Sequence, residues 1–121
     1  MNAKHDRVFL KHLMDFNVVP IIIWSFDGNV LSANDAFLDL IGYSRTEMDA
    51  GKINWRALTP PEYLPLDEHC IQELEKFPIA TPYVKEYFRK DGSRVAIRLF
   101  NGCDPEVPGQ GVAMIIEIEV Y

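Results

Sequence analysis

The chain has 121 residues and a mass of 13.9 kDa, a size that fits one domain and excludes two. Its 48% hydrophobic and 25% charged residues are ordinary for a folded protein, which excludes intrinsic disorder. Eighteen acidic against twelve basic side chains give a net charge of −6, so we expect no nucleic-acid partner. The longest apolar run, Val18 to Trp24, contains Pro20 and is far shorter than the roughly 20 residues that span a bilayer. We therefore expect no membrane contact by this segment and a cytoplasmic location.

The N-terminal residues predict an amphipathic helix. Over residues 5–16, apolar side chains recur at positions i, i+4 and i+7 and form a stripe along one helical face. We therefore divide the chain into an N-terminal amphipathic helix, residues 1–17, and one domain over residues 18–121. No internal repeat or linker interrupts this domain.

A hairpin and a short helix are predicted next. Two β-rich runs, residues 20–27 and 30–34, are joined by turn residues that tolerate positive φ, which is typical of a β-hairpin. Asn34 can cap the helix that follows, and Gly42 can end it.

Two more helices are predicted before the remaining strands. Ser44 and Glu47 have the spacing of a capping box at the start of a short helix. The prolines at 60–61 fit the first turn of a longer helix, and Pro78 ends it. Asp67 and the other charged residues of this helix are expected to face water. Its apolar face is expected to consist of Leu66, Cys70, Ile71, Leu74 and Phe77.

Three strands complete the pattern. The runs 83–90 and 93–100 flank Asp91-Gly92, a strong hairpin signal, and residues 112–120 form the last strand. The resulting order, αββαααβββ, predicts an α+β fold: a five-stranded antiparallel sheet with helices packed on one face. The side chains expected beneath the helices are Val95, Ile97, Leu99, Val112, Met114, Ile116 and Ile118.

The order of elements, together with the residues that fill it, resembles the PAS sensory domain from about Val19 to Ile118. The segments that carry this resemblance are DGNVLSANDAFLDLIGYSRTEM (27–48), INWRALTPPEY (53–63), LDEHCIQELEKF (66–77) and PYVKEYFRKDGSRVAIRL (82–99). The first is similar to the turn, second strand and Asn-capped helix of the family, and the last is similar to its hairpin. The resemblance implies the PAS fold.

The family also implies a role in signalling. PAS domains sit inside histidine kinases, diguanylate cyclases and transcription regulators, where they sense a small ligand, bind a cofactor, or dimerise and relay a signal. We expect a sensory and dimerisation module of a bacterial-type signal-transduction protein, with a sensor histidine kinase of a two-component system as the commonest host. The family's Asp-Ile-Thr ending is absent here. We favour a chain excised from a longer protein, with an effector domain in the same polypeptide.

A candidate ligand pocket lies beneath the helices. Buried Trp55 and Tyr87 need polar partners, so the polar atoms of a small-molecule ligand would dock there. In a domain of this size the same bulky side chains can also fill the core, and we favour a filled core over a bound cofactor. The candidate pocket residues are Phe37, Trp55, Leu58, Leu74, Tyr87, Ile97, Leu99 and Met114.

Haem and flavin are the alternatives to test. In haem-binding PAS domains a histidine on the long helix holds the iron, so His69 is the candidate axial ligand of a haem-based gas sensor. However, His69 lies about 100° from the face marked by Leu66 and Cys70, which favours a solvent-facing residue. Light-sensing PAS domains use a cysteine in an Asn-Cys-Arg-Phe run, and no cysteine occurs near Trp55 and Leu58. We therefore expect neither cofactor.

The residues offer little for catalysis or metal binding. A catalytic triad needs a Ser or Cys nucleophile, a histidine and a third residue that orients the histidine. None of the three histidines, His5, His12 and His69, has such neighbours in the sequence. His5 and His12 are seven apart instead of the four of a helical metal pair. We expect a non-catalytic domain with no metal site, although its parent protein can be a kinase.

The last expectation is a homodimer. The N-terminal helix has an apolar stripe, and the outer sheet face is expected to carry apolar side chains among charges. An isologous dimer would bury both surfaces at once. In the alternative, the helix folds back on its own sheet and the molecule is a monomer. The candidate interface residues are Phe9, Leu13, Phe16, Phe100 and Ile115.

Overall fold

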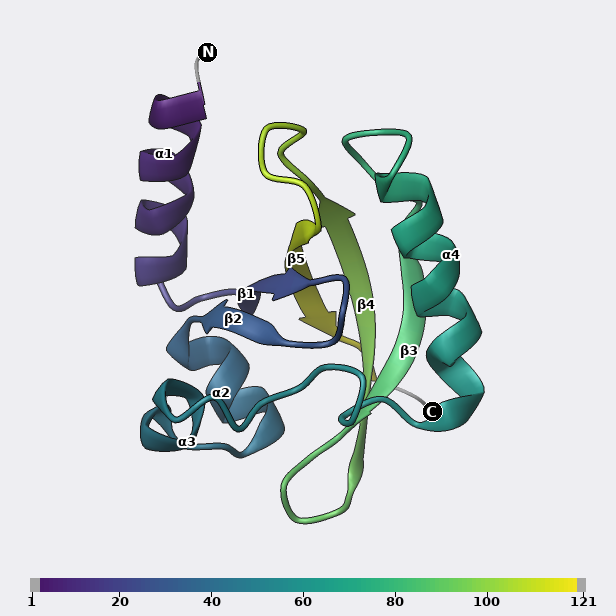
Figure 1. Ribbon diagram of the computed structural model, residues 1–121. Coiled ribbons are helices and arrows are strands. Elements are labelled where there is room, and N and C mark those ends of the chain that lie inside the picture. Colours follow the sequence, from purple (N-terminus) through teal and green to yellow (C-terminus); the bar gives the residue numbers. More distant parts are fainter. Residues whose placement is uncertain (1–2, 120–121) are drawn as a thin grey trace.

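The computed structural model describes residues 3–119, with side chains described from residue 8 onward. Five antiparallel strands form one sheet in the order β2-β1-β5-β4-β3 (Figure 1). The strands are β1 (Ile21–Ser25), β2 (Val30–Ala33), β3 (Tyr83–Phe88), β4 (Arg94–Gly102) and β5 (Gln110–Glu117). The helices are α1 (Ala3–Asp15), α2 (Asp35–Ile41), α3 (Arg45–Asp49), the 3-10 helix η1 (Pro61–Tyr63) and α4 (Leu64–Leu74).

The predicted order of helices and strands is confirmed, with one addition and one difference. The proline pair opens a 3-10 turn, η1, before α4 begins. The last strand ends at Glu117, three residues before the predicted end at Val120, which lies outside the described residues. Figure 1 shows α4 running alongside β3 and β4, while α2 and α3 lie next to the β1–β2 hairpin.

Side-chain caps fix the short helices as the sequence predicts. Asn34 Oδ1 accepts hydrogen bonds from the backbone N–H groups of Phe37 and Ile21, and Asn34 Nδ2 donates to the carbonyl of Val19. One asparagine therefore caps α2 and ties it to β1. The capping box of Ser44 and Glu47 begins α3, with both reciprocal hydrogen bonds present.

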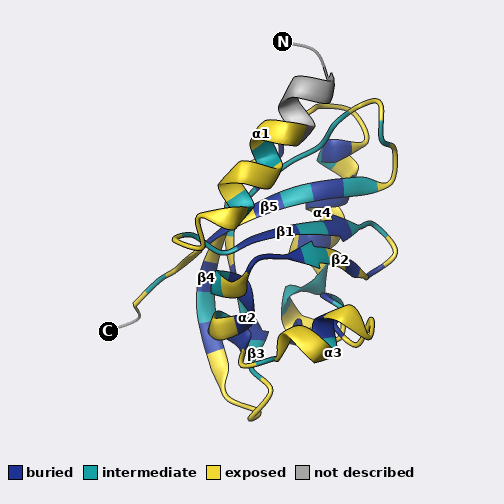
Figure 2. Cartoon of the chain, turned by 90° about the vertical axis from the view of Figure 1, so that its left-hand side faces the viewer, coloured by how far each residue is buried: buried dark blue, intermediate teal, exposed yellow. Residues whose placement is uncertain are grey.

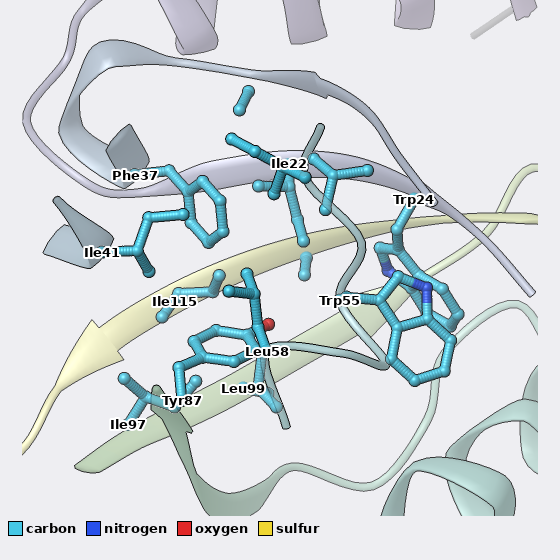
Figure 3. Close-up of a cluster of buried hydrophobic side chains, with 14 of the residues drawn as sticks. Ile22, Trp24, Phe37, Ile41, Trp55, Leu58, Tyr87, Ile97, Leu99 and Ile115 are labelled. Carbon is cyan, nitrogen blue, oxygen red and sulfur yellow. The ribbon is translucent and has the colours of Figure 1, made fainter. Parts of the chain in front are cut away.

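The core lies between the inner face of the sheet and the helices. Side chains from β1, β3, β4 and β5 meet α2 and the segment between α3 and η1 (Figure 3). Phe37 of α2 packs edge to face on Tyr87 of β3, with ring centroids 6.0 Å apart. This contact joins the helical layer to the sheet.

The side chains of β5 lie on the opposite faces of the sheet from those predicted. Met114, expected in the pocket, lies on the outer face and is 41% exposed. Ile115, expected on the outer face, is 0% exposed and points into the core (Figure 3). Val112 and Ile116 turn outward with Met114, and Ala113 turns inward with Ile115. The assignment of Ile115 to a dimer interface was therefore wrong.

The ring of Trp24 explains this reversal. Trp24 of β1 pairs with Gly111 of β5, and a Cβ atom at Gly111 would lie 2.6 Å from two carbons of the indole ring. Only glycine fits beneath that ring, so Gly111 must be on the inner face. The period of two along a strand then turns Ala113 and Ile115 inward as well.

The buried face of α4 also differs from the prediction. Its buried residues are Asp67, Cys70, Ile71 and Leu74, which have the i, i+3, i+4, i+7 spacing of one helical face. Leu66 and Phe77, predicted to be inside, are exposed. The carboxylate of Asp67 can be buried because it has a cationic partner in the core, which is described below.

Helix α1 stands clear of the sheet. It projects away from the body of the domain in Figure 1, and most of its described length is exposed in Figure 2. Phe9, Leu13 and Phe16 of its apolar stripe are all exposed. The alternative arrangement, in which this helix folds back on its own sheet, is therefore absent from the described residues. None of the described helices is long and apolar enough to cross a membrane.

Candidate functional site

A small cavity lies inside the core, between α4 and the inner face of the sheet. Its volume is about 20 Å³, which is room for about one water molecule. Aromatic rings and polar groups form much of its wall: Trp24, Trp55, Tyr83, Tyr87, Asp67, Lys85 and Asn101.

A buried ion pair lies at this cavity. Lys85 of β3 is 2% exposed, and its Nζ lies 2.9 and 3.0 Å from the two carboxylate oxygens of Asp67 on α4. The same Nζ donates to Thr59 Oγ1 at 2.8 Å. Tyr83 completes the group, because its hydroxyl donates to Asp67 Oδ1 at 2.6 Å. These are the short distances of charge-assisted hydrogen bonds.

Burial dominates the electrostatics of this group. It lowers the pKa of Lys85 from its ordinary value, and the neighbouring Asp67 carboxylate opposes that shift. Burial also raises the pKa of Tyr83 and Tyr87, and the charge of Asp67 raises both further. Both phenols are therefore neutral at physiological pH, and the Tyr83 hydroxyl donates a hydrogen bond to Asp67. Buried ion pairs with shifted pKa values occur at functional sites and in structural networks alike.

The two tryptophans of the cavity have their polar atoms satisfied by the chain. Trp55 Nε1 donates to the carbonyl of Ser25 at 2.8 Å, and Trp24 Nε1 donates to Asn101 Oδ1 at 3.1 Å. The two indole rings meet edge to face, with centroids 5.5 Å apart. The polar atom of Trp55 that was expected to meet a ligand is thus bonded to the protein itself.

The predicted pocket residues fall into three groups. Trp55, Tyr87 and Leu99 line the cavity. Met114 lies outside the core, as described above. The other four are buried in the surrounding core without lining the cavity: Phe37, Leu58, Leu74 and Ile97.

The polar residues of the cavity are the part that the sequence analysis missed. A signal was available in β3, where the period of two places Lys85 on the same face as Tyr87, a residue already expected inside. A lysine on an inward face requires a buried carboxylate. Asp67 was the candidate, because it is three residues from Cys70 and four from Ile71 on the buried face of α4.

His69, the candidate haem ligand, and the buried thiol of Cys70 are not among the residues that line the cavity. The side chain of His69 is 70% exposed and lies 3.3 Å from the carboxylate of Glu73. Cys70 is buried, and burial raises the pKa of its thiol to about 11, which keeps it protonated and unreactive. No cluster of three or more metal-binding side chains occurs in the described part of the chain. The side chain of His5 lies outside the described residues.

The outer face of the sheet is the second candidate site. Arg98 and Phe100 of β4 pair with Ile116 and Met114 of β5, so these four side chains lie together at the centre of the outer face. Ile116 is 44% exposed and Met114 nearly as much, while Phe100 is half-buried. We call these four residues, with Val112, the outer patch.

Known proteins share both the sequence pattern and the fold. The PAS domain family matches this chain over residues 9–78. The hybrid signal transduction protein dokA of Dictyostelium discoideum is 30% identical over 109 residues, which make up 90% of this chain and 6% of that protein.

Two solved structures illustrate the likeness in fold. A domain of the sensory box sensor histidine kinase/response regulator from Geobacter sulfurreducens has a TM-score of 0.72 at 18% identity, over 94% of this chain and 96% of that one. The LOV domain of a blue-light activated histidine kinase from Erythrobacter litoralis has a TM-score of 0.64 at 19% identity, over 84% and 96%. At such identities the likeness shows the fold alone. The family match covers more than half of this chain. The chain therefore belongs to the PAS domain family, the sensory modules of signalling proteins.

Proposed function

We propose that this chain is the sensory and dimerisation module of a two-component signalling protein, with a histidine kinase as host and an effector domain in the same polypeptide. Its output is a protein–protein relay, made through the outer patch and α1. The observation that carries this proposal is the group of apolar side chains, Met114, Ile116, Phe100 and Val112, that lie beside Arg98 in the outer patch.

The outer patch is unusual for a solvated sheet face. Antiparallel sheets with one face in water alternate apolar residues inside with polar residues outside. Here the two central strands expose Met114 and Ile116 beside half-buried Phe100. Exposed apolar side chains gathered in this way mark a surface that another protein covers.

Helix α1 offers a matching surface. Phe9 of α1 is largely exposed, and so are Phe16 and Val18 in the segment that follows its last residue, Asp15. A two-fold dimer brings the same patches of two chains together, so α1 and the outer patch can be buried in one step. We therefore propose Phe9, Leu13, Phe16 and Phe100 as interface residues, with Ile116 in place of Ile115.

The size of the cavity favours relay over cofactor binding. About 20 Å³ is one water molecule, whereas a flavin or a haem would have to displace aromatic side chains such as Trp55 and Tyr87. His69 points to solvent, away from any pocket wall, so no observation favours the haem alternative. The proposal places the module in the cytoplasm, where thiols such as Cys70 and Cys103 remain reduced.

Sedimentation velocity tests this proposal. We expect a dimer at high micromolar concentration, and a folded monomer after Phe16→Glu or Ile116→Glu, because either carboxylate would be buried unpaired in the interface. Leu66→Glu is the matched control, since Leu66 is similarly exposed but lies on α4, on the opposite side of the sheet. A wild-type monomer at high micromolar concentration, or equal disruption by Leu66→Glu, contradicts the proposal.

A further inference from the structure

Hydrogen-bond acceptors and aromatic rings surround the Lys85 ammonium. Its three N–H donors meet the two oxygens of Asp67 and Thr59 Oγ1 at 2.8 to 3.0 Å. Its charge also lies 4.6 Å from the ring centroid of Tyr87 and 5.6 Å from that of Trp55, within the range of cation–π attraction.

This set of groups is chemically specific. A carboxylate, a hydroxyl acceptor and two aromatic faces are what proteins use to recognise an ammonium ion. We call Asp67, Thr59, Trp55 and Tyr87 together the ammonium site. Its members come from α4, from the segment between α3 and η1, and from β3, so the site is assembled by the whole fold.

The groups of the ammonium site also make hydrogen bonds that do not involve Lys85. The hydroxyl of Tyr83 donates to Asp67 Oδ1 and fixes the carboxylate. Thr59 donates its own hydroxyl proton to the carbonyl of Trp55 at 2.7 Å, so its oxygen is turned to accept from the cation. The indole of Trp55 is fixed in turn by its bond to Ser25. An ordered site of this kind needs little reorganisation to accept a free cation.

We propose that the centre of this domain is a binding site for primary alkylammonium ions, which the chain fills with its own Lys85. The tethered lysine has a high effective concentration at the site and excludes soluble amines from the wild-type protein. Shortening Lys85 to alanine removes three methylene groups and the amino group, which correspond atom for atom to n-propylammonium. That variant should therefore bind n-propylammonium from solution.

Titration of Lys85→Ala with n-propylammonium chloride, followed by calorimetry and thermal melting, tests the inference. We expect saturable binding at least tenfold tighter than to Lys85→Met, whose thioether fills the same space, and a melting temperature that rises with the amine. Propanol and matched sodium chloride should have no such effect. Lys90→Ala, which shortens an exposed lysine, is the control for non-specific amine binding.

The absence of saturable binding to folded Lys85→Ala, or an equal response to propanol, overturns the inference. Should the variant fold only when the amine is added during refolding, that dependence supports it. Should it fold under neither condition, NMR of the wild-type protein decides. A slowly exchanging Lys85 ammonium signal with contacts to the ring protons of Tyr87 and Trp55 supports the site, and a rapidly exchanging neutral amine contradicts it.

Discussion

Replacing Ile115 and Ile116 by alanine, one at a time, tests the orientation of β5. The two residues have the same chemistry and are neighbours in sequence, but Ile115 is 0% exposed and Ile116 is 44% exposed. Truncating a fully buried isoleucine costs about 2 to 5 kcal/mol, because apolar transfer energy is lost and a cavity remains. Only about half of the Ile116 surface is buried, so truncating this side chain should cost roughly 1 kcal/mol of unfolding free energy.

The assay is urea and thermal unfolding of both variants at one low protein concentration, so that subunit association contributes little. The expected difference of about 1 to 4 kcal/mol corresponds to a melting temperature roughly 4 to 16 °C lower for Ile115→Ala than for Ile116→Ala in a domain of this size. A larger loss for Ile116→Ala would show that the strand has the opposite orientation, and equal losses would contradict the orientation assigned from Trp24 and Gly111.

Three further predictions concern single sites. Gly111→Ala should destabilise by about 1 to 3 kcal/mol in urea unfolding, because its Cβ collides with the Trp24 ring, and an unchanged midpoint would contradict that contact. The Lys90 ammonium and a backbone N–H hold the pKa of Glu47 at about 2, below its ordinary 4.5. The stability that Glu47 contributes is therefore complete above pH 4.5 and lost as the pH falls toward 2, and NMR titration should show this pKa rising toward 4.5 in Lys90→Ala. His69→Ala should change stability by no more than about 0.5 kcal/mol in thermal melts, because its side chain is exposed, and a larger loss would show that the outward orientation of His69 is wrong.

Local signals predicted most of the fold. The Asn34 cap, the capping box of Ser44 and Glu47, and the glycines of the two hairpin turns each depend on residues close in sequence. Gly28 and Gly92 have φ of 122° and 88°, values that other residues rarely adopt. Such features can be predicted from a sequence because the interacting residues are only a few positions apart.

The errors arose where the partner is distant. Both faces of β5 are rich in apolar residues, so alternation alone could not choose between them. The choice depended on Trp24, which lies on another strand and requires glycine beneath its ring. In α4, Asp67 appeared to be a solvent residue because its partner Lys85 is 18 positions away on β3. Tertiary contacts decided both orientations, against the local hydrophobic pattern.

Native mass spectrometry of the purified chain tests whether this domain is a ligand-free dimer, because it reports subunit number and bound mass together. We expect the mass of two chains with no cofactor added, since the cavity of about 20 Å³ holds no more than a water molecule and we propose that a second copy covers the outer patch. A single chain that carries the mass of a haem, a flavin or another tightly bound ligand would contradict it.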